Sequence, residues 1–211
     1  MADVTGTVRD VANALIGLAG IRAVSLGGSR ALGMDDASSD TDLYAWYRGT
    51  LVGAAVRQQA LADLADDVVV PFDAFGPEDH WHSDRRPFEV VYVDLDVIRA
   101  QISRARSVGL DGEVCATAFL HTAYAGVPIA DPYAELDRLQ TDLASFPEAT
   151  RTTQLLQLPN VADRLRTACL TAPNDPSLAE QFVSLIAEIV ALYEAGSSSA
   201  AQGRAQEPDS T

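Results

Sequence analysis

The chain has 211 residues and a formal net charge of −15, and none of its 15 Lys and Arg residues is a lysine. This length allows one domain, or two small ones, with a sizeable buried core. Such acidity argues against broad nucleic-acid binding, which depends on basic residues meeting phosphates, and is compatible with a cationic small substrate.

Neither a membrane location nor a disulfide framework is predicted. No apolar run approaches the length of a membrane span. The first 20 residues carry acids and lack a basic n-region, so they do not resemble a signal peptide, and a cytoplasmic protein is expected. Cys115 and Cys169 lie far apart in the sequence, which favours two free buried thiols over a disulfide or a metal-binding pair.

The first half of the chain mixes helical and extended patterns. Apolar spacing predicts helices over residues 4–18 and 52–64, and apolar runs predict strands over 21–26, 43–47 and 88–95. A short strand is expected at 68–72, where Pro71 limits its length. Residues 73–87 are expected to be irregular.

The second half is predicted to be helical. Helices are expected over 97–108, 113–124, 133–143, 148–156, 161–170 and 177–193, with Gly and Pro breaks between them. The whole indicates an α+β fold, with a small mixed sheet and flanking helices in residues 1–100, a helical bundle in 101–195 and a disordered tail in 196–211.

The stretch from Leu26 to Tyr47 carries the most chemical information. Asp40 and Asp42 open the second strand, and side chains at i and i+2 share one face. Two carboxylates this close repel each other unless a cation lies between them, and Mg²⁺ prefers such oxygen ligands and often shares substrate phosphates. Gly27 and Gly28 allow close backbone approach to a ligand.

A glycine-serine turn followed by a paired-aspartate strand resembles the DNA polymerase β-type nucleotidyltransferase superfamily. Gly28-Ser29 and Asp40-Thr41-Asp42-Leu43 match its signature, and Ser39 before Asp40 is usual in its bacterial branch that modifies small molecules such as aminoglycosides and lincosamides. The resemblance implies a nucleotidyltransferase fold and a Mg²⁺-dependent reaction in which a nucleoside triphosphate (NTP) is the co-substrate. It also implies a third carboxylate on a later strand beside the aspartate strand.

Glu89 occupies the position that the resemblance predicts for the third acid. Glu89 shares a strand face with Val91 and Val93, and an unpaired buried carboxylate there would be costly. The plainer reading is a strand-end glutamate that faces solvent or pairs with Arg86. Asp94 and Asp96 are the fallback candidates, although Asp94 falls on the other face.

The resemblance assigns a role to each candidate residue. Asp40, Asp42 and Glu89 are expected to be catalytic and to hold two Mg²⁺ ions. Gly27, Gly28, Ser29 and Arg30 are expected to bind the phosphates of the NTP. Glu89 or a second acid, with Glu113 as a speculative choice, would take the proton from the hydroxyl of a small acceptor.

Two rival functions remain open at this stage. One is transfer to a protein or tRNA, as in small toxin–antitoxin nucleotidyltransferases, although the acidity counts against tRNA. The other is a non-catalytic nucleotide-binding protein. His80 and His82 are expected in a surface loop at a cleft rim, because no further Cys or His nearby completes a tetrahedral metal site with them.

Overall fold

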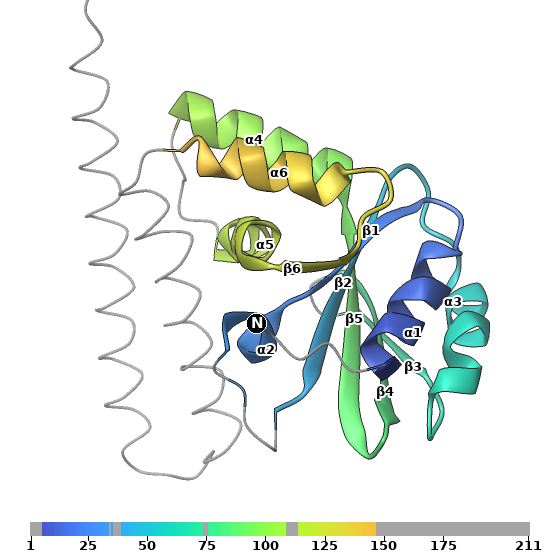
Figure 1. The fold of residues 1–211 in the computed structure, drawn as a ribbon. Helices are drawn as coiled ribbons and strands as arrows, with labels where there is room; N and C mark the ends of the chain where they lie inside the picture. The colour runs from blue at the N-terminus through green and yellow to red at the C-terminus, as the bar shows by residue number, and fades with distance from the viewer. Residues whose placement is uncertain (1–5, 34, 36–38, 74–75, 109–113, 147–211) are drawn as a thin grey trace, which may run out of the picture. The chain divides into compact units, whose positions relative to one another are not determined.

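The structure is a computed structural model, and it describes residues 6–33, 35, 39–73, 76–108 and 114–146. The helices are α1 (Gly6–Ile16), α2 (Gly28–Leu32), α3 (Ala54–Leu61), the 3-10 helix η1 (Ala62–Leu64), α4 (Leu95–Val108), α5 (Val114–Ala125) and α6 (Glu135–Ala144). The strands are β1 (Ile21–Leu26), β2 (Thr41–Tyr47), β3 (Val70–Asp73), β4 (Pro77–Ser83), β5 (Arg86–Asp94) and β6 (Val127–Ala130). Figure 1 gives their arrangement.

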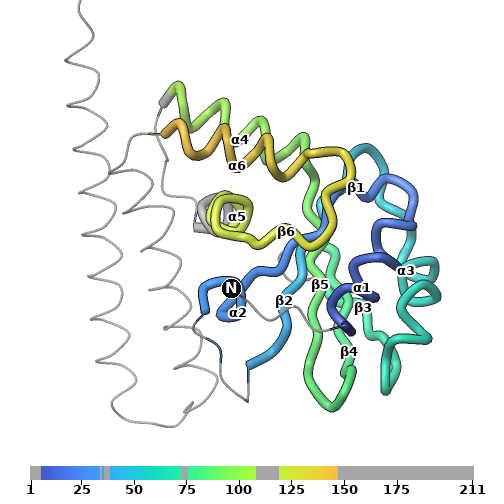
Figure 2. The backbone as a smooth tube through the Cα atoms, viewed as in Figure 1, coloured from blue at the N-terminus to red at the C-terminus, as the bar shows by residue number. Residues whose placement is uncertain are grey.

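Six strands of the described residues form one sheet in the order β3-β4-β5-β2-β1-β6. β2 and β5 run parallel, and the other neighbouring pairs are antiparallel. β1 and β6 lie side by side although they are far apart in the sequence (Figure 2). The prediction of an α+β fold with a small mixed sheet and flanking helices is confirmed. The helices expected after residue 146, and the tail, lie outside the described residues.

One face of the sheet forms the main core beneath α1 and α3 (Figure 1). Leu43 of β2 and Val90 of β5 are fully buried there, together with Val11 and Leu15 of α1. Alternate strand residues supply this face, so their neighbours at i±1 point to the opposite face. Asp42 and Glu89 directly precede Leu43 and Val90 and therefore lie on that opposite face.

A buried ion pair ties α3 to the sheet within this core. Arg57 Nε donates to Asp79 Oδ2 at 2.8 Å and Arg57 Nη2 donates to Oδ1 at 3.3 Å. The guanidinium carbon lies 4.6 Å from the centre of the Tyr92 ring. Burial, reinforced by the negative charge of Asp79, raises the pKa of Tyr92 above its ordinary value.

The prediction that residues 73–87 are irregular is wrong, because they contain β4 and the start of β5. The inward positions of β4 include Asp79, whose charge is matched by Arg57, so the strand lacks the apolar alternation by which strands are predicted. Asp84 and Arg85 form the turn between β4 and β5, with φ of 52° and 61°. Two positive φ values suit the hairpin turn that usually carries Asn-Gly, and that signature is missing here.

The chain divides into two compact units. The first contains residues 1–100 and 122–141, and the second contains 101–121 and 142–211. The chain leaves the first unit after residue 100 and later returns to it to add β6, a strand that the sequence does not predict. Among the described residues, no helix has both the length and the apolar character that a membrane crossing needs.

Candidate metal and nucleotide site

The parallel pairing of β2 with β5 brings the predicted acids together. Asp42 lies opposite Glu89 in the register, and Asp40 precedes β2 by one residue. One carboxylate oxygen from each of Asp40, Asp42 and Glu89 lies within 4.8 Å of the others, and all three side chains are half-buried. Three carboxylates at this spacing repel one another unless a cation lies between them. The arrangement can hold a divalent ion.

The Gly27-Gly28 turn after β1 lies directly against Asp42. The Gly27 N–H donates to the carbonyl oxygen of Asp42 at 2.8 Å, which extends the pairing of β1 with β2. Gly28 has a φ of +57°, and a Cβ built there would lie 1.7 Å from Asp42 Oδ2. A Cβ at Gly27 would lie 2.3 Å from Cε2 of the Tyr44 ring. Any side chain at either position would displace its neighbour.

Arg30 of α2 holds the backbone that carries Asp40. Its Nε donates to the carbonyl oxygen of Asp40 at 2.6 Å, and its Nη2 donates to the carbonyl oxygen of Ser39 at 2.8 Å. Its Nη1 also lies 3.5 Å from Asp35 Oδ2. The guanidinium therefore fixes the segment that enters β2, in addition to the nucleotide role that the sequence predicts for it.

Aromatic side chains form the floor next to the acids. The Tyr44 and Trp46 rings stack with their centres 6.2 Å apart, and Trp46 Nε1 donates to the buried Ser25 Oγ at 2.9 Å. Both residues follow Asp42 at alternate positions, so they share its face of β2. The ring stacking and the hydrogen bond to Ser25 hold the part of β2 that follows Asp42 against β1.

A second group of possible ligands lies on the other side of Glu89. His80 of β4 is opposite Glu89 in the register, and ligand atoms of Glu78, His80 and Glu89 lie within 4.8 Å of one another. Glu78 is not predicted as a site residue, because residues 73–87 show no strand pattern that would place it beside Glu89. The expectation that His80 and His82 lie in a surface loop is wrong, because both belong to β4, and Trp81 between them is buried and stacks on Phe88.

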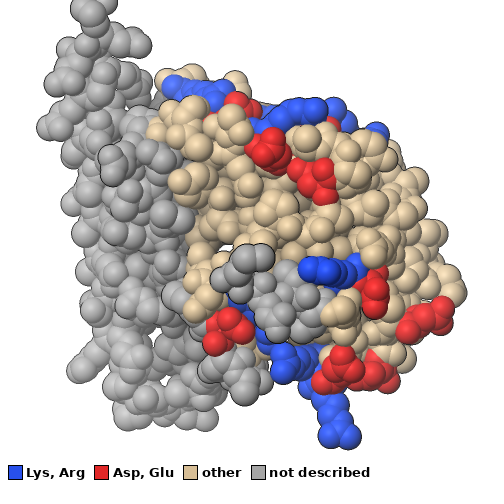
Figure 3. Space-filling view, in the orientation of Figure 1, with Lys and Arg blue, Asp and Glu red and all other residues tan. Residues whose placement is uncertain are grey.

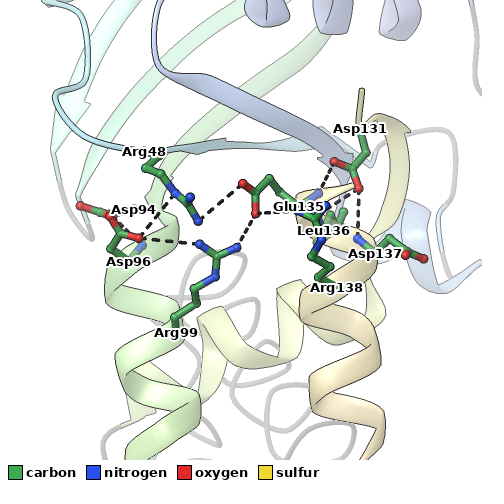
Figure 4. Close-up of polar contacts among 9 residues, drawn as sticks. All are labelled: Arg48, Asp94, Asp96, Arg99, Asp131, Glu135, Leu136, Asp137 and Arg138. Atoms are coloured by element: carbon green, nitrogen blue, oxygen red, sulfur yellow. Dashed lines mark hydrogen bonds and ion pairs between the residues drawn. The ribbon is translucent and has the colours of Figure 1, made fainter. Parts of the chain in front are cut away.

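Asp94 and Asp96, the fallback candidates for the third acid, lie in a different polar cluster from Asp40, Asp42 and Glu89 (Figure 4). Asp94 ends β5, roughly 17 Å along the strand from Glu89 by the usual rise per residue. Its Oδ1 accepts a hydrogen bond from the N–H of Asp96 at 2.8 Å. Asp96 in turn lies 3.6 Å from Arg48 Nε and 3.8 Å from Arg99 Nη1. These acids belong to a separate polar cluster, and Glu113 lies outside the described residues.

The separate cluster is centred on Glu135 at the start of α6. Its buried carboxylate contacts Arg48, Arg99 and Arg138, with Arg48 at 3.5 Å and Arg138 at 3.7 Å (Figure 4). Asp131 caps the same helix by accepting hydrogen bonds from three of its N–H groups. The cluster ties the end of β2 and the start of α4 to α6 and gives these acids a structural role.

Charge is not gathered in one patch on the face drawn in Figure 3. There, acidic and arginine side chains lie close to one another in several small groups, with uncharged surface between the groups. The net negative charge of the chain is therefore not expressed as a single acidic patch on that face.

No protein family model and no curated protein matches the chain. Among solved structures, the chain is similar to a nucleotidyltransferase-like protein from Exiguobacterium sibiricum, with 13% sequence identity and a TM-score of 0.38. The match covers 89% of this chain and 57% of that chain. Similarity at this level carries no argument about function, which must come from the site itself.

Proposed function

We propose that the protein is a Mg²⁺-dependent nucleotidyltransferase that moves a nucleoside monophosphate from an NTP to a hydroxyl group of a small molecule. The observation that carries the proposal is the convergence of the Asp40, Asp42 and Glu89 carboxylates within 4.8 Å. A glycine turn with no room for a side chain adjoins them at Gly28. All the donors are carboxylate oxygens, which fit Mg²⁺.

Each part of the site has a role in this proposal. Asp40, Asp42 and Glu89 would hold two Mg²⁺ ions, which would stabilise the attacking and leaving oxygens. We assign the β- and γ-phosphates to the N–H groups of Gly28 and Ser29 and to the Ser29 hydroxyl, because the Gly27 N–H already donates to Asp42. Arg30 would keep Asp40 in place through the two carbonyl groups that it holds.

The proposed reaction is a single nucleophilic displacement at the α-phosphorus of the NTP. The acceptor oxygen forms a bond to the α-phosphorus, the bond from that phosphorus to the bridging oxygen breaks, and pyrophosphate leaves. The proton of the acceptor hydroxyl would pass to a carboxylate of the site, and we assign this role to Glu89.

We propose a cationic, hydroxylated small molecule, such as an aminoglycoside-type antibiotic, as the acceptor. The net charge of −15 supports this class, because it favours the approach of cations over that of nucleic acids. A cytoplasmic location, where NTPs are available, is part of the same proposal.

The test is a pyrophosphate-release assay with each NTP, Mg²⁺ and a panel of aminoglycosides, lincosamides, tRNA and protein acceptors. Wild-type protein is expected to release pyrophosphate with a small cationic acceptor, and Asp42→Asn is expected to abolish release while keeping the circular dichroism spectrum. Nucleotide binding without turnover on any acceptor would favour the non-catalytic alternative. Turnover that survives Asp42→Asn would refute the assignment.

A further inference from the structure

Glu89 lies between two groups of side chains on the same face of the sheet. On one side is Asp42 of β2, and on the other is His80 of β4, each opposite Glu89 in the register. Glu78 is two residues before His80 and therefore shares its face. The four residues form a continuous polar row across β4, β5 and β2, of which the proposed transfer uses only the half that contains Asp42.

The Glu78, His80 and Glu89 group already has the spacing of metal ligands. Glu78 Oε2 lies 3.1 Å from His80 Nε2, and ligand atoms of all three residues lie within 4.8 Å of one another. Ligands about 2.1 Å from a tetrahedral ion lie roughly 3.4 Å apart, so the Glu78–His80 pair is already close to this distance. The Glu78 side chain is 3% exposed, and that of His80 is 39% exposed. The group therefore has a buried anchor and an imidazole that solvent can reach.

The surroundings hold His80, and not His82, in this group. The Phe72 ring of β3 meets the His80 ring edge-on, with centres 5.3 Å apart. His82 is instead bound by Asp67, with His82 Nδ1 2.7 Å from Asp67 Oδ2. The hydrogen bonds from the His82 backbone and ring lower the pKa of Asp67. His82 is thus held by Asp67 and does not join this group.

We infer that Glu78, His80 and Glu89 form a second cation site, selective for divalent transition metals such as Zn²⁺. Its donors are one imidazole nitrogen and two carboxylate oxygens, a combination that Zn²⁺ accepts and that is less suited to Mg²⁺ than the all-carboxylate set of Asp40, Asp42 and Glu89. Solvent water would complete the coordination on the exposed side of His80.

The shared residue couples the two sites. An ion bound by Glu78 and His80 takes an oxygen of Glu89 and adds positive charge close to the Asp40 and Asp42 site, so each ion weakens the binding of the other. If the proposed transfer takes place, Zn²⁺ inhibits it, and loss of His80 relieves that inhibition. This consequence rests on the proposed function, whereas Zn²⁺ binding itself does not.

The experiment is calorimetric titration of the full chain with ZnCl₂, and separately with MgCl₂, without nucleotide. We expect His80→Asn and Glu78→Gln each to weaken Zn²⁺ binding at least about tenfold, since loss of a ligand costs no less than loss of an outer-shell partner. His82→Asn, a change on the same face of the same strand, is the matched control and leaves Zn²⁺ affinity within about twofold. Asp40→Asn weakens Mg²⁺ binding only, and Glu89→Gln weakens both.

Each outcome decides the inference. Failure of the wild-type chain to bind Zn²⁺ would overturn it, as would Zn²⁺ binding that survives both His80→Asn and Glu78→Gln, or that falls equally in His82→Asn. Far-ultraviolet circular dichroism checks the fold of each variant, and should His80→Asn fail to fold, Glu78→Gln gives the same reading. These titrations contain no NTP, so an absence of Zn²⁺ binding would not refute the proposed nucleotide transfer. Conversely, an absence of nucleotide transfer would not refute Zn²⁺ binding.

Discussion

Gly28 lies against the carboxylate of Asp42 so closely that a Cβ at Gly28 would fall 1.7 Å from Asp42 Oδ2. Gly28 and Asp42 are 14 positions apart in the sequence, with Gly28 at the start of α2 and Asp42 on β2. Two separate constraints therefore favour glycine at position 28. A side chain would collide with the Asp42 carboxylate, and the φ of +57° lies in a region that residues with a Cβ rarely adopt.

Gly28→Ala is expected to displace the Asp42 carboxylate and to lower affinity for an NTP with Mg²⁺ at least about tenfold. The positive φ alone costs about 1–2 kcal/mol for a residue with a Cβ. Gly33→Ala is the matched control, because Gly33 has a φ of +68° with nothing within 4 Å of a Cβ. We expect Gly33→Ala to lower the melting temperature without a loss of affinity. Equal affinity losses in both variants would contradict the account.

Arg30→Ala is expected to loosen the segment that carries Asp40. The variant removes the hydrogen bonds to the Ser39 and Asp40 carbonyl groups, so Mg²⁺ affinity should fall roughly tenfold, as for outer-shell partners of a metal site. Arg9→Ala, a change of an exposed arginine on α1, provides the control for loss of charge. Calorimetric titration with MgCl₂ measures both, and unchanged affinity in Arg30→Ala would show that Asp40 needs no such support.

Asp79→Asn is expected to destabilise the fold without touching the acidic site. Asp79 is fully buried and holds Arg57, so removing its charge leaves a buried guanidinium without its ionic partner. The expected loss is about 3–5 kcal/mol in the free energy of unfolding. Urea denaturation measures it, with Asp10→Asn on the surface of α1 as the control. A loss equal to that of the control would contradict the assignment of this pair as a core element.

Tyr92 makes stability fall in alkaline solution. Its pKa is raised in the folded state, mainly by burial, so the folded state holds the phenol proton more tightly than the unfolded chain does. The contribution of Tyr92 to stability is therefore complete below about pH 10 and is lost as the pH rises further. Tyr92→Phe should reduce this loss in urea midpoints measured from pH 8 to 11. Identical pH profiles for wild type and variant would contradict this account.

The sequence predicted much of the first unit because its strands and helices carry ordinary apolar periods. The apolar runs at 43–47 and 88–95 mark strands, and Val8, Val11 and Leu15 follow helical spacing, which identifies the core face of α1. The same apolar runs placed Asp42 and Glu89 on strands, and their pairing in the structure follows from the parallel register of β2 with β5.

The remaining features depend on contacts between distant residues. β4 is polar because Asp79 pairs with Arg57, and β6 is a short strand that pairs with β1 from far along the chain. The proximity of Gly28 to Asp42, and of Glu78 and His80 to Glu89, arises from strand order. A periodicity within one segment contains no information on these relationships.

The most direct test of the proposed site is calorimetric titration of wild type and Asp42→Asn with each NTP, in the presence and absence of Mg²⁺. The account predicts that one of these nucleotides binds wild type, that Mg²⁺ strengthens this binding at least about tenfold, and that Asp42→Asn loses the Mg²⁺-dependent part while keeping its fold. Nucleotide binding that is indifferent to Mg²⁺, or that is equal in the two proteins, would contradict the claim that these carboxylates hold a metal ion for a triphosphate.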